Sequence, residues 1–176
     1  MATEVKGGVN AGGFTKIVTA GFTRPADTTQ YTANDVVSNS TSATSLLVFK
    51  NCVRENGGSG LIHSGFLFTS VDAATNPHFD LLLFDQIGLT LAADNAAGTI
   101  SDTEVLSLVA AITFDGTTTS SAHTAGGNLV IRASNVGQAF RCAPNTRDLY
   151  GVVVDRGAYT PASAEIFNFK IAILQD

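Results

Sequence analysis

The histidines and cysteines are the side chains of this sequence best suited to catalysis or metal binding. His63, His78 and His123 have no second histidine four residues away and no adjacent glutamate, so their spacing matches no common zinc motif. Cys52 and Cys142 are too few and too far apart in sequence for a disulfide framework or a structural zinc site, and we expect two buried thiols. No Gly-x-Ser-x-Gly segment presents a serine nucleophile. The sequence therefore predicts a protein that is not an enzyme and holds no metal.

Carboxylates and glycine runs could instead serve a calcium or phosphate site. The loop that begins at Asp94 matches a calcium-binding pattern only loosely, and we expect Asp94 to lie in a turn and Asp80 on the solvent face of a strand. The glycine runs at 57–60 and 126–127 lack the lysine and the strand-to-helix context of a phosphate loop, which favours hairpin tips. We expect no cofactor.

Composition and charge exclude several classes of protein. The 176 residues suffice for one domain, and only 14% are charged, against roughly 25% in a typical domain, which suits strands and turns better than a helical bundle. The net charge is −5 and the ten basic residues are scattered singly, so nucleic acid is a poor partner. No apolar stretch approaches the roughly 20 residues of a membrane span, and no apolar signal segment begins the sequence. We expect no membrane partner and no export.

Several segments have the composition and alternation of β-strands. In the last of them, 165–174, Asn168, Lys170 and Ala172 fall on one face. The opposite face carries Phe167, Phe169, Ile171 and Ile173. The earlier segments are 16–22, 45–50, 61–71, 79–84, 129–132 and 148–155. We expect the first to end before Pro25, which cannot donate to a sheet ladder, and the third and fourth to be neighbouring strands.

One segment has a helical pattern. Ser101 and Glu104 fit a capping box, and an apolar stripe follows at Val105, Leu106, Leu108 and Val109. The predicted fold class is therefore all-β, an antiparallel β-sandwich that is jelly-roll-like, with one short inserted helix at about 101–111. We expect residues 14–176 to form this single sandwich domain. The glycine-rich residues 1–13 predict a flexible N-terminal arm, which either frays or orders against a neighbouring subunit.

Four blocks of sequence carry a family resemblance. They are TRPADTTQYTANDVV at 23–37, LLLFDQ at 81–86, AADNAAGTISDTE at 92–104 and LYGVVVDRGAYTPASAE at 149–165. In this order and spacing, the chain resembles a group of small structural proteins of tailed bacteriophages and prophages.

The resemblance implies a virion component, and a capsid decoration or cement protein with a jelly-roll-like domain fits it best. Such a protein is made in the cytoplasm of the bacterial host and sits on the capsid surface of the virion. Its partner is the major capsid protein of the shell, and it forms a homo-oligomer, with a homotrimer favoured. It stabilises the shell by mass action, because it binds the assembled shell and not its parts. The resemblance supplies no catalytic residue.

Three regions are the expected protein interface: the arm, the loop after the first strand, and the turn before the last one. Their residues are Lys6, Gly7, Gly8, Gly12 and Gly13, then Arg24, Pro25, Asp27, Tyr31 and Asp35, and finally Tyr159 and Pro161. The two tyrosines either anchor the interface or plug an end of the sandwich. The alternative functions are a tail- or fibre-associated β-sandwich module that binds glycan or another tail protein, and an enzyme on a cupin-like barrel. The absence of Trp disfavours a glycan site.

Overall fold

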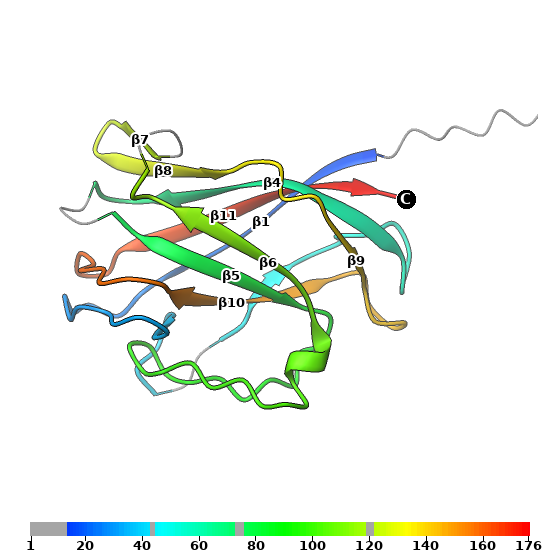
Figure 1. Ribbon diagram of the computed structural model, residues 1–176, viewed down its shortest axis with the longest axis horizontal. Helices are drawn as coiled ribbons and strands as arrows, with labels where there is room; N and C mark the ends of the chain where they lie inside the picture. The colour runs from blue at the N-terminus through cyan, green and yellow to red at the C-terminus, as the bar shows by residue number, and fades with distance from the viewer. Residues whose placement is uncertain (1–13, 43–44, 73–75, 119–121) are drawn as a thin grey trace, which may run out of the picture.

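Two antiparallel β-sheets lie face to face in this computed structural model, which describes residues 14–42, 45–72, 76–118 and 122–176 (Figure 1). The only helical element among these residues is a 3-10 turn, η1 (Val105–Ser107). The strands are β1 (Phe14–Thr23), β2 (Val36–Val37), β3 (Leu47–Phe49), β4 (Ser59–Thr69), β5 (His78–Phe84), β6 (Leu108–Asp115), β7 (Ala122–Ala125), β8 (Asn128–Ala133), β9 (Gln138–Arg141), β10 (Leu149–Asp155) and β11 (Ile166–Gln175).

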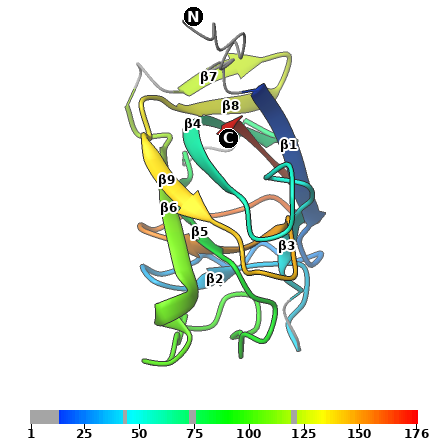
Figure 2. The same ribbon diagram turned by 90° about the vertical axis from the view of Figure 1, so that its right-hand side faces the viewer.

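The strand order is that of a jelly roll. The first sheet runs β1-β11-β4-β8-β7, with β9 also paired to β4. The second sheet runs β2-β10-β5-β6, with β3 also paired to β10. The chain crosses between the sheets at most of its connections, so strands distant in sequence become neighbours, as in other jelly rolls. Figure 2 shows the two layers, with β4 and β8 above β5 and β2. The predicted antiparallel sandwich is confirmed.

The core lies between the two sheets and follows the alternation of the strands. On β11, the four side chains predicted to share one face are all fully buried. Phe169 packs edge-on against Phe114 of the second sheet, with ring centroids 5.6 Å apart. Each such buried side chain contributes about 1.5–3 kcal/mol through the area it removes from water.

Both cysteines are buried thiols, as predicted. Burial raises the pKa of Cys52 to about 12 and that of Cys142 to about 11.

A second, smaller apolar cluster covers the outer face of the second sheet. Its buried members are Val36, Phe84, Val152 and Val154. The segment between β5 and β6, seen in green at the bottom of Figure 1, packs leucines and Ile100 over them. This cover explains why β5 and β10 are apolar on both faces.

The predicted helix over 101–111 is wrong. The capping box does form, since the Ser101 N–H donates to Glu104 Oε2 at 2.9 Å and the Glu104 N–H donates to Ser101 Oγ at 3.2 Å. The box spans only the turn at 101–104, the single turn of η1 follows it, and Leu108 then begins β6. From Ala110 onward, buried and exposed residues alternate with a period of two. The segment therefore pairs with β5 as a strand, although its apolar residues also have a helical spacing.

The expected strand neighbours and one of the two expected hairpin tips need correction. The segments 61–71 and 79–84 are not neighbouring strands, because β4 belongs to the first sheet and β5 to the second. The glycine run 126–127 is the predicted hairpin tip, between β7 and β8, with positive φ at both residues. The run 57–60 is not such a tip, because its last two residues begin β4.

Candidate functional site

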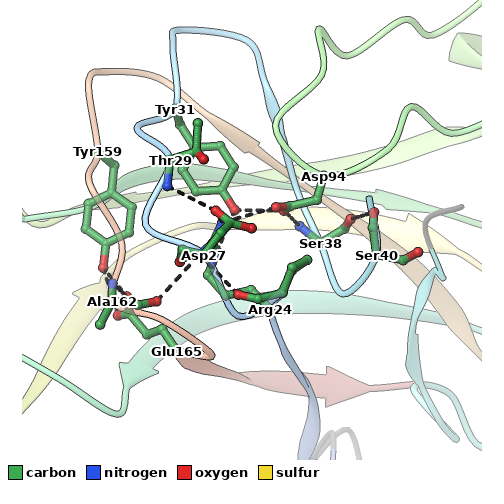
Figure 3. A network of polar contacts seen from close by, with 11 residues as sticks. Arg24, Asp27, Thr29, Tyr31, Ser38, Ser40, Asp94, Tyr159, Ala162 and Glu165 are labelled. Atoms are coloured by element: carbon green, nitrogen blue, oxygen red, sulfur yellow. Dashed lines mark hydrogen bonds and ion pairs between the residues drawn. The ribbon is translucent and has the colours of Figure 1, made fainter. Parts of the chain in front are cut away.

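Four of the residues predicted for the loop and turn interface lie close together, and Figure 3 shows them: Arg24, Asp27, Tyr31 and Tyr159. Arg24 follows β1 directly, and its N–H donates to the Glu165 carbonyl oxygen at 3.0 Å. The N–H of Tyr31 donates to the Tyr159 carbonyl oxygen at 2.9 Å, and the two rings stack with centroids 6.4 Å apart. The loops before β2 and before β11 are thereby joined to each other.

The Arg24 guanidinium is buried at the centre of a polar network. Its Nη2 lies 3.2 Å from Asp94 Oδ2 and 3.1 Å from Asp27 Oδ1, and its Nε donates to the Tyr31 hydroxyl at 2.9 Å. That hydroxyl donates to Asp94 Oδ1 at 2.7 Å, and the Ser38 N–H donates to the same oxygen at 2.7 Å. Asp94 is 6% exposed. It is therefore the buried counter-ion of Arg24, a role its predicted place in a turn did not suggest.

A second buried acid closes the same end. The Tyr159 hydroxyl lies 2.7 Å from both Glu165 carboxyl oxygens and shares its proton between them, and the Ala162 N–H donates to Oε2 at 3.0 Å. Burial raises the pKa of Glu165, although these hydrogen bonds limit the rise. Burial likewise raises the pKa of Tyr159. The pair keeps the turn before β11 folded against the core.

Asp155, at the end of β10, is fully buried and neither carboxyl oxygen has a hydrogen bond of ordinary geometry to a described residue. Burial raises the pKa of Asp155 to about 6. The nearby backbone N–H groups of Gly157, Arg156 and Tyr159 favour the ionised form and limit this rise, whereas the negative charge of Asp35 adds to it. This carboxyl destabilises the fold when it is ionised.

Seven of the predicted interface residues lie in the part of the chain that the structure describes, and five of these seven are inside the chain. Arg24, Tyr31, Asp35, Tyr159 and Pro161 are buried. Pro25 and Asp27 are partly exposed. The two tyrosines therefore plug an end of the sandwich, which is one of the two roles expected for them. The arm residues Lys6, Gly7, Gly8, Gly12 and Gly13 lie outside the described residues.

An exposed apolar surface lies elsewhere, on the outer face of the first sheet. We call it the aromatic–cation face; its residues are Ile17, Phe66, Phe68, Val130, Arg132, Lys170 and Leu174. Ile17 is 64% exposed, and Phe66 and Leu174 are each 37% exposed. Phe66 stands opposite Lys170 on β11 and opposite Arg132 on β8, so an aromatic ring lies between two cations across the sheet.

The charge on this face has one sign. The four strands β1, β11, β4 and β8, which the structure describes in full, contain no Asp or Glu, although the whole chain has a net charge of −5. The Lys170 ammonium lies 5.2 Å from the centroid of the Phe68 ring, and the Phe68 and Phe66 rings are 6.0 Å apart. Aromatic residues and arginine are the types enriched where proteins bind one another.

The sequence held a signal for this face that the strand analysis missed. Phe66, Leu67 and Phe68 are consecutive, so β4 must place large apolar side chains on both of its faces. On β11, the face interpreted as polar also carries Ile166 and Leu174 at its two ends, 42% and 37% exposed.

A cleft of about 230 Å³ lies on the opposite side of the molecule, between the second sheet and its covering segment. Its lining includes Leu82, Val152 and Val154 of the sheet and Leu91 and Ile100 of the cover.

An ion pair lies at the exposed edge of this cleft. Arg156 Nε is 3.1 Å from Asp80 Oδ2, and the Thr113 hydroxyl donates to Asp80 Oδ1 at 2.7 Å. The Arg156 side chain is 49% exposed, and apart from this ion pair its guanidinium has no hydrogen bond to any described residue.

Within the described ranges, no group of three or more His, Cys, Asp or Glu side chains is placed to hold a metal ion. No helix in the same part of the chain has the length and apolarity of a membrane span. In comparisons with known proteins, no family model matches this chain and no curated protein is significantly similar to it.

Proposed function

We propose that this chain is a structural protein of a tailed-bacteriophage virion, a capsid decoration protein that binds and stabilises the assembled head shell. The observation that carries the proposal is the aromatic–cation face. A monomeric protein rarely exposes apolar residues together on one sheet face unless that face binds something. The four sequence blocks that resemble phage structural proteins supply the class of partner.

The chemistry of the face favours a rigid protein surface that is apolar and acidic. Phe66 and Phe68 offer broad contact area, and Arg132 and Lys170 provide charge that an acidic shell would complement. A jelly roll holds these side chains on paired strands, so little conformational entropy is lost on binding. Binding then stabilises the shell by mass action, without any chemical step.

Charge reversal and apolar-to-charged changes on the face test this proposal. Phe66→Asp and Lys170→Glu should each weaken co-sedimentation with mature heads that lack the protein, by at least about tenfold for Phe66→Asp. Ile87→Asp is the matched control, because Ile87 is 65% exposed and lies outside the face. Added salt should weaken wild-type binding, since part of the attraction is between exposed charges. Equal binding by all three variants would refute the assignment of the face.

A further inference from the structure

A second exposed apolar feature lies on the turn before β6. Leu106 is 85% exposed and Val105 is 47% exposed, and we call these two residues the apolar tip. The tip lies on the side of the second sheet, away from the aromatic–cation face (Figures 1 and 2).

Polar contacts hold the apolar tip in place. The Glu104 carboxylate accepts hydrogen bonds from the N–H groups of Ser101 and Thr90 and from the Ser101 hydroxyl. The Ser107 hydroxyl donates to the Glu104 carbonyl oxygen at 2.7 Å, and the Asp85 N–H donates to the Ser107 carbonyl oxygen at 3.1 Å. The exposed leucine thus projects from a turn that is fixed before any partner arrives, which lowers the entropy lost on binding.

The cleft beside Arg156 is large enough and apolar enough to receive such a side chain. Its volume is about 230 Å³, and aliphatic side chains form most of its lining, with Asp80 and Arg156 among the polar lining residues. A cavity of about 150 Å³ is enough to hold a benzene molecule. The cleft is therefore large enough for a leucine side chain. It is small for a typical ligand pocket, which measures about 300–1,000 Å³.

We infer that the apolar tip of one copy docks in the cleft of a second copy of this chain. A convex apolar tip and a concave apolar cleft on one chain suit self-association. Charge supports the pairing as well: Asp102 beside the tip is exposed and has no hydrogen-bond partner among the described residues. At the cleft, the half-exposed Arg156 pairs with Asp80 through Nε, which leaves its two Nη groups for a second carboxylate. The contact is independent of the proposed shell binding, because it leaves the aromatic–cation face uncovered.

The oligomeric state of the purified full chain tests this inference by sedimentation velocity over a range of concentrations. The wild type should associate reversibly. Leu106→Asp, which puts a charge on the tip, and Thr99→Trp, which puts a bulky side chain in the cleft lining, should each weaken association by at least about tenfold. Leu106→Ala should weaken it less. Ile17→Asp, a change of the same kind at a 64% exposed residue of the aromatic–cation face, should leave association unchanged.

A mixing experiment identifies the contact. Leu106→Asp keeps an intact cleft and Thr99→Trp keeps an intact tip, so an equimolar mixture should recover association that neither variant shows alone. Unchanged thermal unfolding of both variants would establish that they are folded. A monomeric wild type, wild-type association in both variants, or no recovery on mixing would each overturn the inference. Head binding by Ile17→Asp and Phe66→Asp reports separately on the shell proposal.

Discussion

The Arg24 guanidinium is enclosed by two carboxylates and a tyrosine hydroxyl at the closed end of the sandwich. A buried ion pair contributes little net stability when it is intact, because desolvation offsets the attraction. Removing one partner of the pair lowers stability strongly, because the remaining charge stays buried without its counter-ion. Asp94 would be that charge here, since it is 6% exposed and its Oδ2 lies 3.2 Å from Arg24.

Replacing Arg24 should therefore destabilise the protein strongly. We expect Arg24→Met to lower the free energy of unfolding by about 3–5 kcal/mol, measured by urea denaturation at neutral pH. Arg147→Met is the matched control, because Arg147 is exposed, and its effect should stay within about 0.5 kcal/mol. A loss below about 1 kcal/mol for Arg24→Met would show that the end of the sandwich does not depend on this pair.

Asp155 predicts a dependence of stability on pH. Its pKa is about 6 in the folded protein and its ordinary value is 3.8. The folded state therefore binds the proton more tightly than the unfolded state, so stability falls as pH rises from about 4 to about 6 and stays lowered above that. The difference of about two pKa units corresponds to a cost of about 3 kcal/mol at pH 8.

Asp155→Asn should remove that cost. We expect the variant to be more stable than the wild type by about 1–3 kcal/mol at pH 8, and the difference should shrink as pH falls toward 4. Urea unfolding at a series of pH values measures it, with Asp102→Asn as an exposed control. A variant less stable than the wild type at pH 8 would contradict the reasoning.

At the residue scale, the sequence singled out residues that do cluster and left two roles open for the two tyrosines. Arg24 and Tyr31 belong to one predicted interface region and Tyr159 to another, and in the structure the three side chains cluster. Their burial depends on Asp94 and Glu165, which come from other loops. No local pattern states that a distant carboxylate will neutralise an arginine, so the sequence could not distinguish an exposed anchor from a buried plug.

At the scale of elements, η1 shows how a correct local signal can end in the wrong element. The capping box forms, but it spans only the turn before η1, and η1 itself has three residues. Ile112 and Phe114 then alternate with exposed residues and pair with β5, whose register buries them. Pairing partners lie outside any local window, and this is why the strand replaced the helix. Three of the short strands, β2, β7 and β9, have two to four residues and too little alternation to be predicted.

Glu104 should control the order of this turn. Glu104→Ala removes the acceptor for the N–H groups of Thr90 and Ser101, so the amides of the turn should exchange with solvent faster. The amides of β5 and β10 should keep their protection, because their ladder is untouched. Hydrogen exchange followed by mass spectrometry measures both regions, with Glu55→Ala as an exposed control. Unchanged exchange at Thr90 and Ser101 would contradict the role given to Glu104.

At the scale of the whole molecule, the jelly roll could be predicted because strand alternation and low charge both favour a sandwich. The 165–174 segment became β11 with its four predicted side chains buried. The two outer faces could not be predicted, because they depend on which strands become neighbours. The aromatic–cation face forms only when β11, β4 and β8 pair side by side, and the cleft forms only when 85–104 folds over the second sheet.

The two outer faces have different tasks in this account. We propose that the aromatic–cation face binds the shell and that the apolar tip and cleft on the opposite side join copies of the chain. A protein that binds a shell on one face and its own copies through another gains avidity, because each bound copy raises the effective concentration of the next.

The most direct test compares binding of the purified protein to assembled phage heads that lack it and to dissociated capsid subunits. We expect saturable binding to heads at a fixed copy number per shell, a higher temperature of head disruption, and weak binding to dissociated subunits. No binding to intact heads by folded protein, or binding that leaves head stability unchanged, would contradict this expectation and favour a tail-associated module that binds glycan or another tail protein.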